Sequence, residues 1–386
     1  MNLTKFVGSL YASAITSEDS NKVLGPGSIY TALLLVLAGA EDVTRNQLLN
    51  AMGISQDANN EDIHSKAFNL YLKDFNNKVA DGPELTSCNR IYVKENFPIH
   101  KTYKDHLETK YNVVAKNVDF ATNSDEIACE ANSLVDETTN GKIKNIVKPQ
   151  DFDANTVMLL INAIYFKGNW EKCFDGELTE LQDFHKLDSS VVQVHFMTDP
   201  KNRKIGFMEF DGYRVAYLPF KNSKMRMAFI LPELKNGLPN LVAKLFREDS
   251  NFAEFQDILN HSTDPTTQEV KVIIPRFEIG STVRLNEPLQ KMGVTNAFSM
   301  NDADFTRLHA ENQRGIYVAK AVHKAFLKVD ETGAEAAAAT GIVMQSRCLR
   351  IPIEFVADHP FLVVIINEQN APLFIGQICD PTKNEE

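Results

Sequence analysis

The chain has 386 residues, of which 44% are hydrophobic and 24% are charged, so it can bury a large core. Its 51 acidic and 40 basic residues give a net charge of −11, which argues against general nucleic-acid binding. No apolar run reaches the ~20 residues needed to cross a bilayer, so neither nucleic acid nor membrane is expected as a partner.

Neither the lysines nor the cysteines mark a ligand site. Lys66, Lys73 and Lys78 spread along one expected helix, where a solvated face is favoured over a polyanion site, so no glycosaminoglycan is expected. The cysteines lack CxxC and zinc spacing, which predicts no metal, no cofactor and no disulfide framework, and a reducing compartment. They are Cys88, Cys129, Cys173, Cys348 and Cys379.

The chain begins with a helical pattern instead of a secretory leader. Apolar residues recur at helical spacing from Leu3 to Ile15, which predicts an amphipathic helix that packs on the protein. We therefore expect a cytoplasmic location, with release from the cell by an unconventional route left open.

Helical patterns dominate up to residue 80. Gly25-Pro26-Gly27-Ser28 is interpreted as a turn, and Ser28 is predicted to cap the helix that contains residues 33–37. Asn60, followed by two acidic residues, is predicted to start a further helix whose apolar face extends to Phe75.

Strands and two more helices follow. The apolar run 157–166 is typical of a central strand covered on both faces. Helices are expected at 239–246 and 285–292. Further strands are expected at 215–220, 225–231, 270–277, 362–366 and 373–378. Helices first and strands later predict an α+β fold with large, mixed or antiparallel sheets. No linker or repeat divides it, so residues 1–386 are expected to form one domain.

The usual enzyme signatures are missing. The sequence has no GxSxG, HExxH, GxxxxGK[ST] or GxGxxG motif. His359, within 357–361, is expected to be packed and hydrogen-bonded, with no catalytic role. A hydrolase whose triad is assembled from distant residues stays open as a disfavoured alternative.

The most informative segment is 331–341. Its four consecutive alanines are good helix formers, so a short helix or a low-complexity connector is one interpretation. An extended strand is the other, because one face would then be small and uncharged while the opposite face carries Glu335. The small face consists of Ala334, Ala336, Ala338 and Thr340.

Candidate protease bait follows this segment. Trypsin-like proteases bind arginine in an acidic specificity pocket, so Arg347 or Arg350 can serve as bait. Arginine on a surface loop is also common without such a role. Cys348 is interpreted as a tolerated small residue, with a redox-sensitive thiol as the alternative.

These motifs, in this order over most of the chain, resemble the serpin family. Segment 162–170, with Asn162 and Trp170, is similar to the central strand and the breach beyond it. Segments 139–143, 230–232, 275–277, 322–325 (with His323) and 357–361 also match. The segment that resembles the serpin hinge consists of Glu331, Thr332, Gly333, Ala334, Glu335, Ala336, Ala337, Ala338, Ala339 and Thr340.

Three positions depart from the family pattern, and at one of them Leu134 stands where a tryptophan is often found, which is expected to cause only repacking. Gly25 replaces a usual serine before Pro26, which is expected to loosen the region where the sheet opens. Ala334 replaces a usual threonine or serine in the hinge, and it is still small enough to insert.

The resemblance implies a fold with a large central sheet, eight to nine helices and an exposed reactive-centre loop at 331–355. It implies a monomeric suicide inhibitor that is cleaved by a trypsin-like serine protease at Arg347–Cys348 and holds that protease in a covalent complex. Arg350 and Met344 are the secondary bait. Ser28, Asn162, His323 and Trp170 would be structural residues where the sheet opens. A non-inhibitory chaperone, carrier or storage member is the alternative, which the small hinge residues disfavour.

Overall fold

The computed structural model describes residues 2–15, 17, 19–77, 79–246, 252–262, 266–331 and 353–384. These ranges contain nine α-helices and fifteen strands. The helices are α1 (Leu3–Ala14), α2 (Pro26–Gly39), α3 (Asp42–Ala51), α4 (Asn60–Ala67), α5 (Lys101–Tyr111), α6 (Ser124–Thr138), α7 (Leu238–Leu245), α8 (Ala253–His261) and α9 (Asn286–Lys291). None of these described helices is long and apolar enough to cross a membrane.

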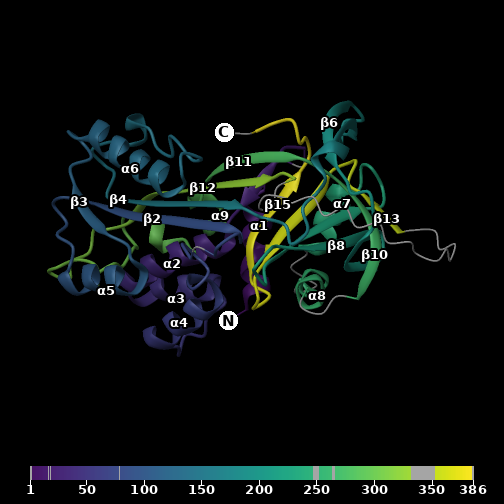
Figure 1. Cartoon of the computed structure of the whole chain (residues 1–386). Coiled ribbons are helices and arrows are strands. Elements are labelled where there is room, and N and C mark those ends of the chain that lie inside the picture. Colours follow the sequence, from purple (N-terminus) through teal and green to yellow (C-terminus); the bar gives the residue numbers. More distant parts are fainter. Residues whose placement is uncertain are drawn as a thin grey trace.

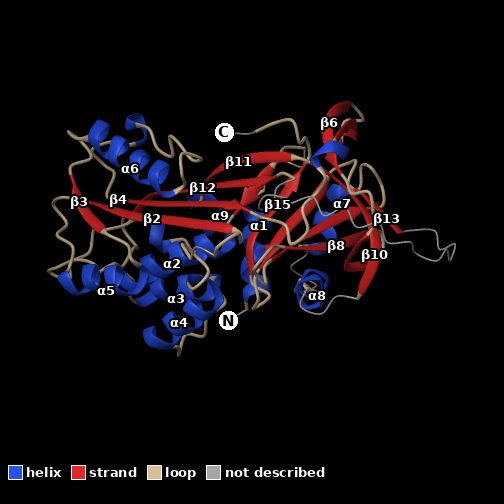
Figure 2. Cartoon of the chain, viewed as in Figure 1, coloured by secondary structure: helices blue, strands red, loops and turns tan. Residues whose placement is uncertain are grey.

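A five-stranded sheet runs along the molecule in the order β11-β12-β4-β2-β3. Its strands are β2 (Glu84–Lys94), β3 (Ala115–Val118), β4 (Met158–Lys167), β11 (Phe277–Arg284) and β12 (Val318–Val329). Helix α6 lies on one side of this sheet and α2 lies on the other (Figures 1 and 2). Every residue of β4 except Lys167 is buried, which confirms the prediction of a central strand covered on both faces.

A ten-stranded sheet forms the other part of the molecule, in the order β1-β15-β14-β9-β8-β7-β10-β6-β5, with β13 paired to β10. Its strands are β1 (Lys22–Leu24), β5 (Glu180–His185), β6 (Val191–Met197), β7 (Arg203–Phe210), β8 (Tyr213–Pro219), β9 (Arg226–Pro232), β10 (Thr267–Pro275), β13 (Ile353–Val356), β14 (Phe361–Ile366) and β15 (Pro372–Ile378). The predicted α+β class with large mixed sheets is confirmed.

Three local predictions need correction. Ser28 does not cap its helix, because α2 begins at Pro26 with Gly25 as its N-cap; proline suits the first helical position, where its missing N–H is not needed. The helix predicted from Asn60 changes to a π-helix over Phe68–Leu72. The strand predicted at 270–277 is divided, because β10 ends at Pro275 and β11 begins at Phe277 in the other sheet.

Candidate functional site

The central contact of the five-stranded sheet is the parallel pair of β4 and β12, which we call the seam. Its register runs from Met158 opposite Val318 to Lys167 opposite Lys328. On their outer sides, β4 pairs with β2 and β12 pairs with β11, and both of these pairs are antiparallel. A strand that entered the seam in the opposite direction would therefore be antiparallel to both of its neighbours.

Three of the predicted structural residues meet at the middle of the seam. Asn162 of β4 lies opposite His323 of β12, and its Oδ1 is 2.5 Å from His323 Nδ1. Its amide nitrogen donates to the hydroxyl of Ser28 in α2 at 2.6 Å. All three residues are fully buried. This polar latch (Ser28, Asn162 and His323) joins both strands and the helix below them, so separating the seam must break it.

The hydrogen bonds fix the state of the His323 ring. Its Nε2 accepts from the backbone N–H of Gly25 at 3.0 Å, so the ring proton lies on Nδ1 and is donated to Asn162. Burial lowers the pKa of His323 to about 3, because the charged form would lose its water. The latch is therefore made by a neutral imidazole at physiological pH.

Two further residues of β2 extend the latch, and neither was predicted from the sequence. The amide nitrogen of Asn162 also lies 2.7 Å from Asn89 Oδ1, and the hydroxyls of Ser28 and Ser87 are 2.7 Å apart. The sequence offered no clear signal, because β2 also contains Glu84, Thr86, Arg90 and Lys94. Assigning Ser87 and Asn89 to the latch required the register, which places Asn89 opposite Asn162.

Gly25 allows a close approach of α2 to β4. A Cβ at this position would lie 2.5 Å from Ile164 Cγ2, so any larger residue would force a shift. The Gly25 N–H also holds His323. This junction is tightly packed, which differs from the loosening expected from the sequence departure.

Trp170 lies at the end of the seam where the chain leaves β12, and not at the latch. Its indole N–H donates to the carbonyl of Asp330 at 2.9 Å. Its ring is 1% exposed and stacks on Phe220, with the centroids 4.8 Å apart. The next residue, Glu331, accepts a hydrogen bond at its carbonyl from the N–H of Phe174 at 3.2 Å. These contacts hold the last described residues before the hinge beside the seam.

His359 anchors the chain after β13. The ring is buried, with Nε2 2.8 Å from the carbonyl of Pro232 and Nδ1 2.7 Å from a carboxylate oxygen of Asp358. Burial alone would raise the pKa of Asp358, but the hydrogen bond with His359 and nearby positive charge hold that pKa below its usual range. His359 is thus packed and hydrogen-bonded, as expected.

Most of the predicted hinge and all of the predicted bait lie outside the described residues. Glu331 is the one hinge residue within them. The residues outside are Thr332, Gly333, Ala334, Glu335, Ala336, Ala337, Ala338, Ala339, Thr340, Met344, Arg347, Cys348 and Arg350.

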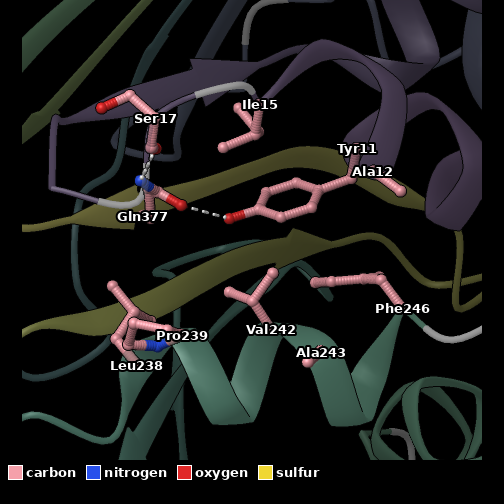
Figure 3. Close-up of a pocket in the computed structure, with 10 residues that line it drawn as sticks. All are labelled: Tyr11, Ala12, Ile15, Ser17, Leu238, Pro239, Val242, Ala243, Phe246 and Gln377. Atoms are coloured by element: carbon pink, nitrogen blue, oxygen red, sulfur yellow. Dashed lines mark hydrogen bonds between the residues drawn. The ribbon is translucent and has the colours of Figure 1, made fainter.

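A pocket of about 250 Å³ lies between α1 and α7 (Figure 3). Tyr11 donates from its hydroxyl to Gln377 Oε1 at 2.9 Å on the side formed by β15. The residues that line the pocket belong to α1, α7, β15 and the ends of these elements, so the pocket is separate from the seam. They are Tyr11, Ala12, Ile15, Ser17, Leu238, Pro239, Val242, Ala243, Phe246 and Gln377.

The sheet order and the latch can be compared with known proteins. The family described as "Serpin (serine protease inhibitor)" matches residues 1–381. The chain belongs to the serpin family. Serpin-ZXA of Oryza sativa is 34% identical over 94% of this chain and 90% of its own length. Serpin-Z7 of Hordeum vulgare is 33% identical, covering 98% of this chain and 95% of its own length.

Solved serpin structures agree with the fold. AtSerpin1 of Arabidopsis, in its native stressed conformation, superposes with a TM-score of 0.84 at 30% identity and covers 99% of this chain and 97% of its own. Serpin48 of the insect Tenebrio molitor gives the same TM-score at 29% identity, with coverage of 98% and 97%. The serpin fold expected from the sequence is therefore confirmed.

Proposed function

We propose that this serpin inhibits trypsin-like serine proteases as a suicide substrate. The protease attacks the carbonyl of Arg347, releases the new amino terminus at Cys348 and remains as an acyl-enzyme on Arg347. The freed segment that begins at the hinge then enters the seam as a new strand and carries the protease with it. Water reaches the distorted acyl-enzyme too slowly to release it.

The seam is the observation that carries this proposal. The chain leaves β12 after Val329, beside the end of β4, and a segment that turned back there would enter antiparallel to both strands. Antiparallel neighbours already lie outside the seam on both sides. Insertion would replace one parallel contact with two antiparallel ones, which are slightly more stable per residue.

Distance and energy are adequate for such a trap. Sixteen residues from the hinge to Arg347, at about 3.3 Å each, would move the protease by roughly 50 Å. A new central strand of about 15 residues gains roughly one net hydrogen bond per residue at ~1 kcal/mol, or ~15 kcal/mol in total. That free energy must be held back by a kinetic barrier until the loop is cut.

The latch supplies part of that barrier. Asn162 and His323 are bonded across the seam, and at the moment the strands separate Asn162 Oδ1 and His323 Nδ1 would each lose its partner while buried. Such a group costs about 1–3 kcal/mol. The small hinge side chains lower the steric cost of entry, so the barrier is paid mainly at the latch and in the backbone bonds of the seam.

Incubation with trypsin followed by a denaturing gel tests the proposal. The wild type should give a band of protein plus protease that survives boiling, and mass spectrometry should find the ester at Arg347. Arg347→Ala should give no such band with trypsin; a persisting band would move the bait to Arg350 or Met344. Ala334→Arg should be cleaved without forming the band, because a buried charge blocks insertion.

The same gel separates the alternatives. Cleavage of the wild type without a stable band would support a non-inhibitory serpin and overturn the proposal. A stable band that forms equally with Ala334→Arg would overturn insertion of the hinge as the trapping step. Turnover of an ester substrate by the serpin alone would indicate an enzyme.

A further inference from the structure

A row of charged side chains crosses the five-stranded sheet at the end of the seam where the chain leaves β12. The register places Glu84 of β2 opposite Lys167 of β4. It places Lys328 of β12 opposite Lys167 on one side and opposite Glu278 of β11 on the other (Figure 1). Residues that lie opposite each other share a face of the sheet, and we call these four the charged row. Two lysines therefore stand next to each other across the seam.

The charged row lies on the face of the sheet that α6 covers. Tyr165 and Phe326 precede the two lysines by two residues and so share their face, and both pack in the buried cluster that contains Val135 of α6. Burial and then the carboxylates of Glu84 and Glu278 raise the pKa of the Tyr165 hydroxyl. The acidic ends of the row therefore act on this same face.

The two lysines of the row differ in their partners. Lys328 Nζ lies 3.9 Å from a carboxylate oxygen of Glu278 and 3.4 Å from one of Asp330, and its side chain is 30% exposed. Lys167 forms no ion pair with any residue in the described part of the chain. Like charges opposite each other weaken a strand pair. One negative charge between the lysines would give a row that alternates in sign from β2 to β11.

The hinge carries one negative charge on the face that such a row requires. A strand inserted between β4 and β12 must turn its small side chains, beginning with Ala334, towards the face opposite α6, where Phe166 and Leu327 are buried. Glu335 lies outside the described residues, and its face follows from the alternation of side chains along a strand. It would share the face of the charged row, because a carboxylate buried on the opposite face would be costly.

The charges also select the register of the inserted strand. A two-residue turn at 331–332 would bring Glu335 opposite Lys328 and, on the other side of the new strand, beside Lys167. A turn one residue later would keep the same faces but bring Glu335 opposite Asp330. Because like charges directly opposite each other are unfavourable, the first register is preferred.

We infer that Lys167 and Lys328 are positioning residues for insertion, which receive the carboxylate of Glu335 between them and fix the register of the new strand. The inference rests on the proposed function, because only insertion brings Glu335 to the charged row. The ionic contact forms with the first residues of the hinge to enter. It should therefore speed insertion relative to hydrolysis of the acyl-enzyme and raise the ratio of trapped to cleaved serpin.

Charge reversal with rescue tests the inference. Each variant is incubated with trypsin at low salt, and the boil-resistant band is compared with the cleaved serpin on a denaturing gel. Glu335→Lys should lower the ratio of trapped to cleaved serpin by about fivefold, because three positive charges would then lie side by side. The pair Lys167→Glu and Lys328→Glu should lower the ratio to a similar extent. All three changes together should recover most of it, because a positive side chain would enter between two negative ones.

A matched control separates the charged row from net charge. It combines Glu335→Lys with Lys66→Glu and Lys101→Glu, two exposed lysines on α4 and α5. The control and the rescuing triple both change the net charge to −11 + 2 − 4 = −13. The control should not recover the ratio. In about 1 M salt the differences among all variants should shrink, because the row is partly exposed and its charges are then screened.

Each outcome decides between the two proposals. If Glu335→Lys traps trypsin as well as the wild type does, or the triple recovers no more than the control, the charged row does not position the hinge and suicide inhibition stands. If the wild type forms no band, the proposed function fails and the inference fails with it. Should the pair of reversed lysines not fold, Lys167→Gln and Glu335→Gln replace it. Their combined loss should not exceed the larger single loss, and additive losses would contradict the inference.

Discussion

The two sheets of this serpin differ in the strand contacts at their centres. In the ten-stranded sheet, β14 lies between β15 and β9, antiparallel to both, and each of its side chains is apolar and at most 1% exposed. In the five-stranded sheet, the central contact is parallel, and a fully buried Asn162 bonds His323 across it. Apolar packing holds the side chains together at the first contact, whereas the second contact depends on a polar latch.

This difference indicates which contact can open. Apolar side chains that interdigitate must all lose their neighbours together when strands part, which makes β14 hard to displace. In the proposed insertion, the seam would part at the end held by Trp170 and then break one latch. If free energy is stored in this sheet as proposed, the protein needs both kinds of contact: a sheet that stays closed and a seam that opens.

The largest effect should come from cutting the loop. Cleavage at Arg347–Cys348 should raise the melting temperature, because the freed segment would fill the seam. For 386 residues the unfolding entropy is about 0.8 kcal/mol/K, so a gain of ~15 kcal/mol corresponds to roughly 15–20 °C. Calorimetry of intact and nicked protein measures the shift. The nicked Ala334→Arg variant is the control and should gain little; equal melting of intact and nicked wild type would mean that no free energy is stored.

The second-largest expected effect is a pH dependence of stability, caused by His323 at the seam. The pKa of His323 falls from 6.5 to about 3 on folding, so between these values the unfolded chain binds more protons than the native one. The contribution of His323 to the free energy of unfolding is therefore fully present above pH 6.5 and is lost as the pH falls towards 3. Its full size is roughly 5 kcal/mol. Urea midpoints measured across this range should fall more steeply for the wild type than for His323→Asn, and parallel curves would contradict the neutral latch.

Substitutions in the two sheets should differ in whether they destabilise the intact protein alone or the intact and the cleaved protein alike. Ile365→Ala in β14 removes buried methyl groups and should lower the free energy of unfolding by about 2–5 kcal/mol in intact and cleaved protein alike. Asn162→Ala leaves the buried Nδ1–H of His323 without its acceptor and should cost the intact form about 1–3 kcal/mol. The cleaved form should be less affected, because the inserted strand already separates β4 from β12. Equal losses in both forms would show that the latch does not act at the seam.

The features of these two sheets could be predicted from the sequence to different extents. The run at 157–166 indicated a strand covered on both faces, because only such a strand tolerates apolar residues on both of its faces. The latch residues Ser28, Asn162 and His323 came from the family resemblance, since nothing local joins positions so far apart. Ser87 and Asn89 needed the register of β2 against β4. Pro275 gave the signal for the corner between β10 and β11, but the aromatic and β-branched residues around it favoured one strand.

The smallest predicted effect is at Trp170, the only tryptophan of the chain. Trp170→Phe keeps an aromatic ring against Phe220 but removes the donor to the carbonyl of Asp330. One such bond is worth about 1 kcal/mol, so the intact form should lose that much while β14 and its neighbours are unaffected. Because Asp330 begins the path to the hinge, the lost bond should also speed insertion after cleavage. Stopped-flow measurement of complex formation with trypsin would detect the faster step, and Phe174→Leu serves as the control because it keeps the Trp170–Asp330 bond. If Trp170→Phe and the control insert at the same rate, the indole only packs, and the opening end of the seam is held by backbone bonds alone.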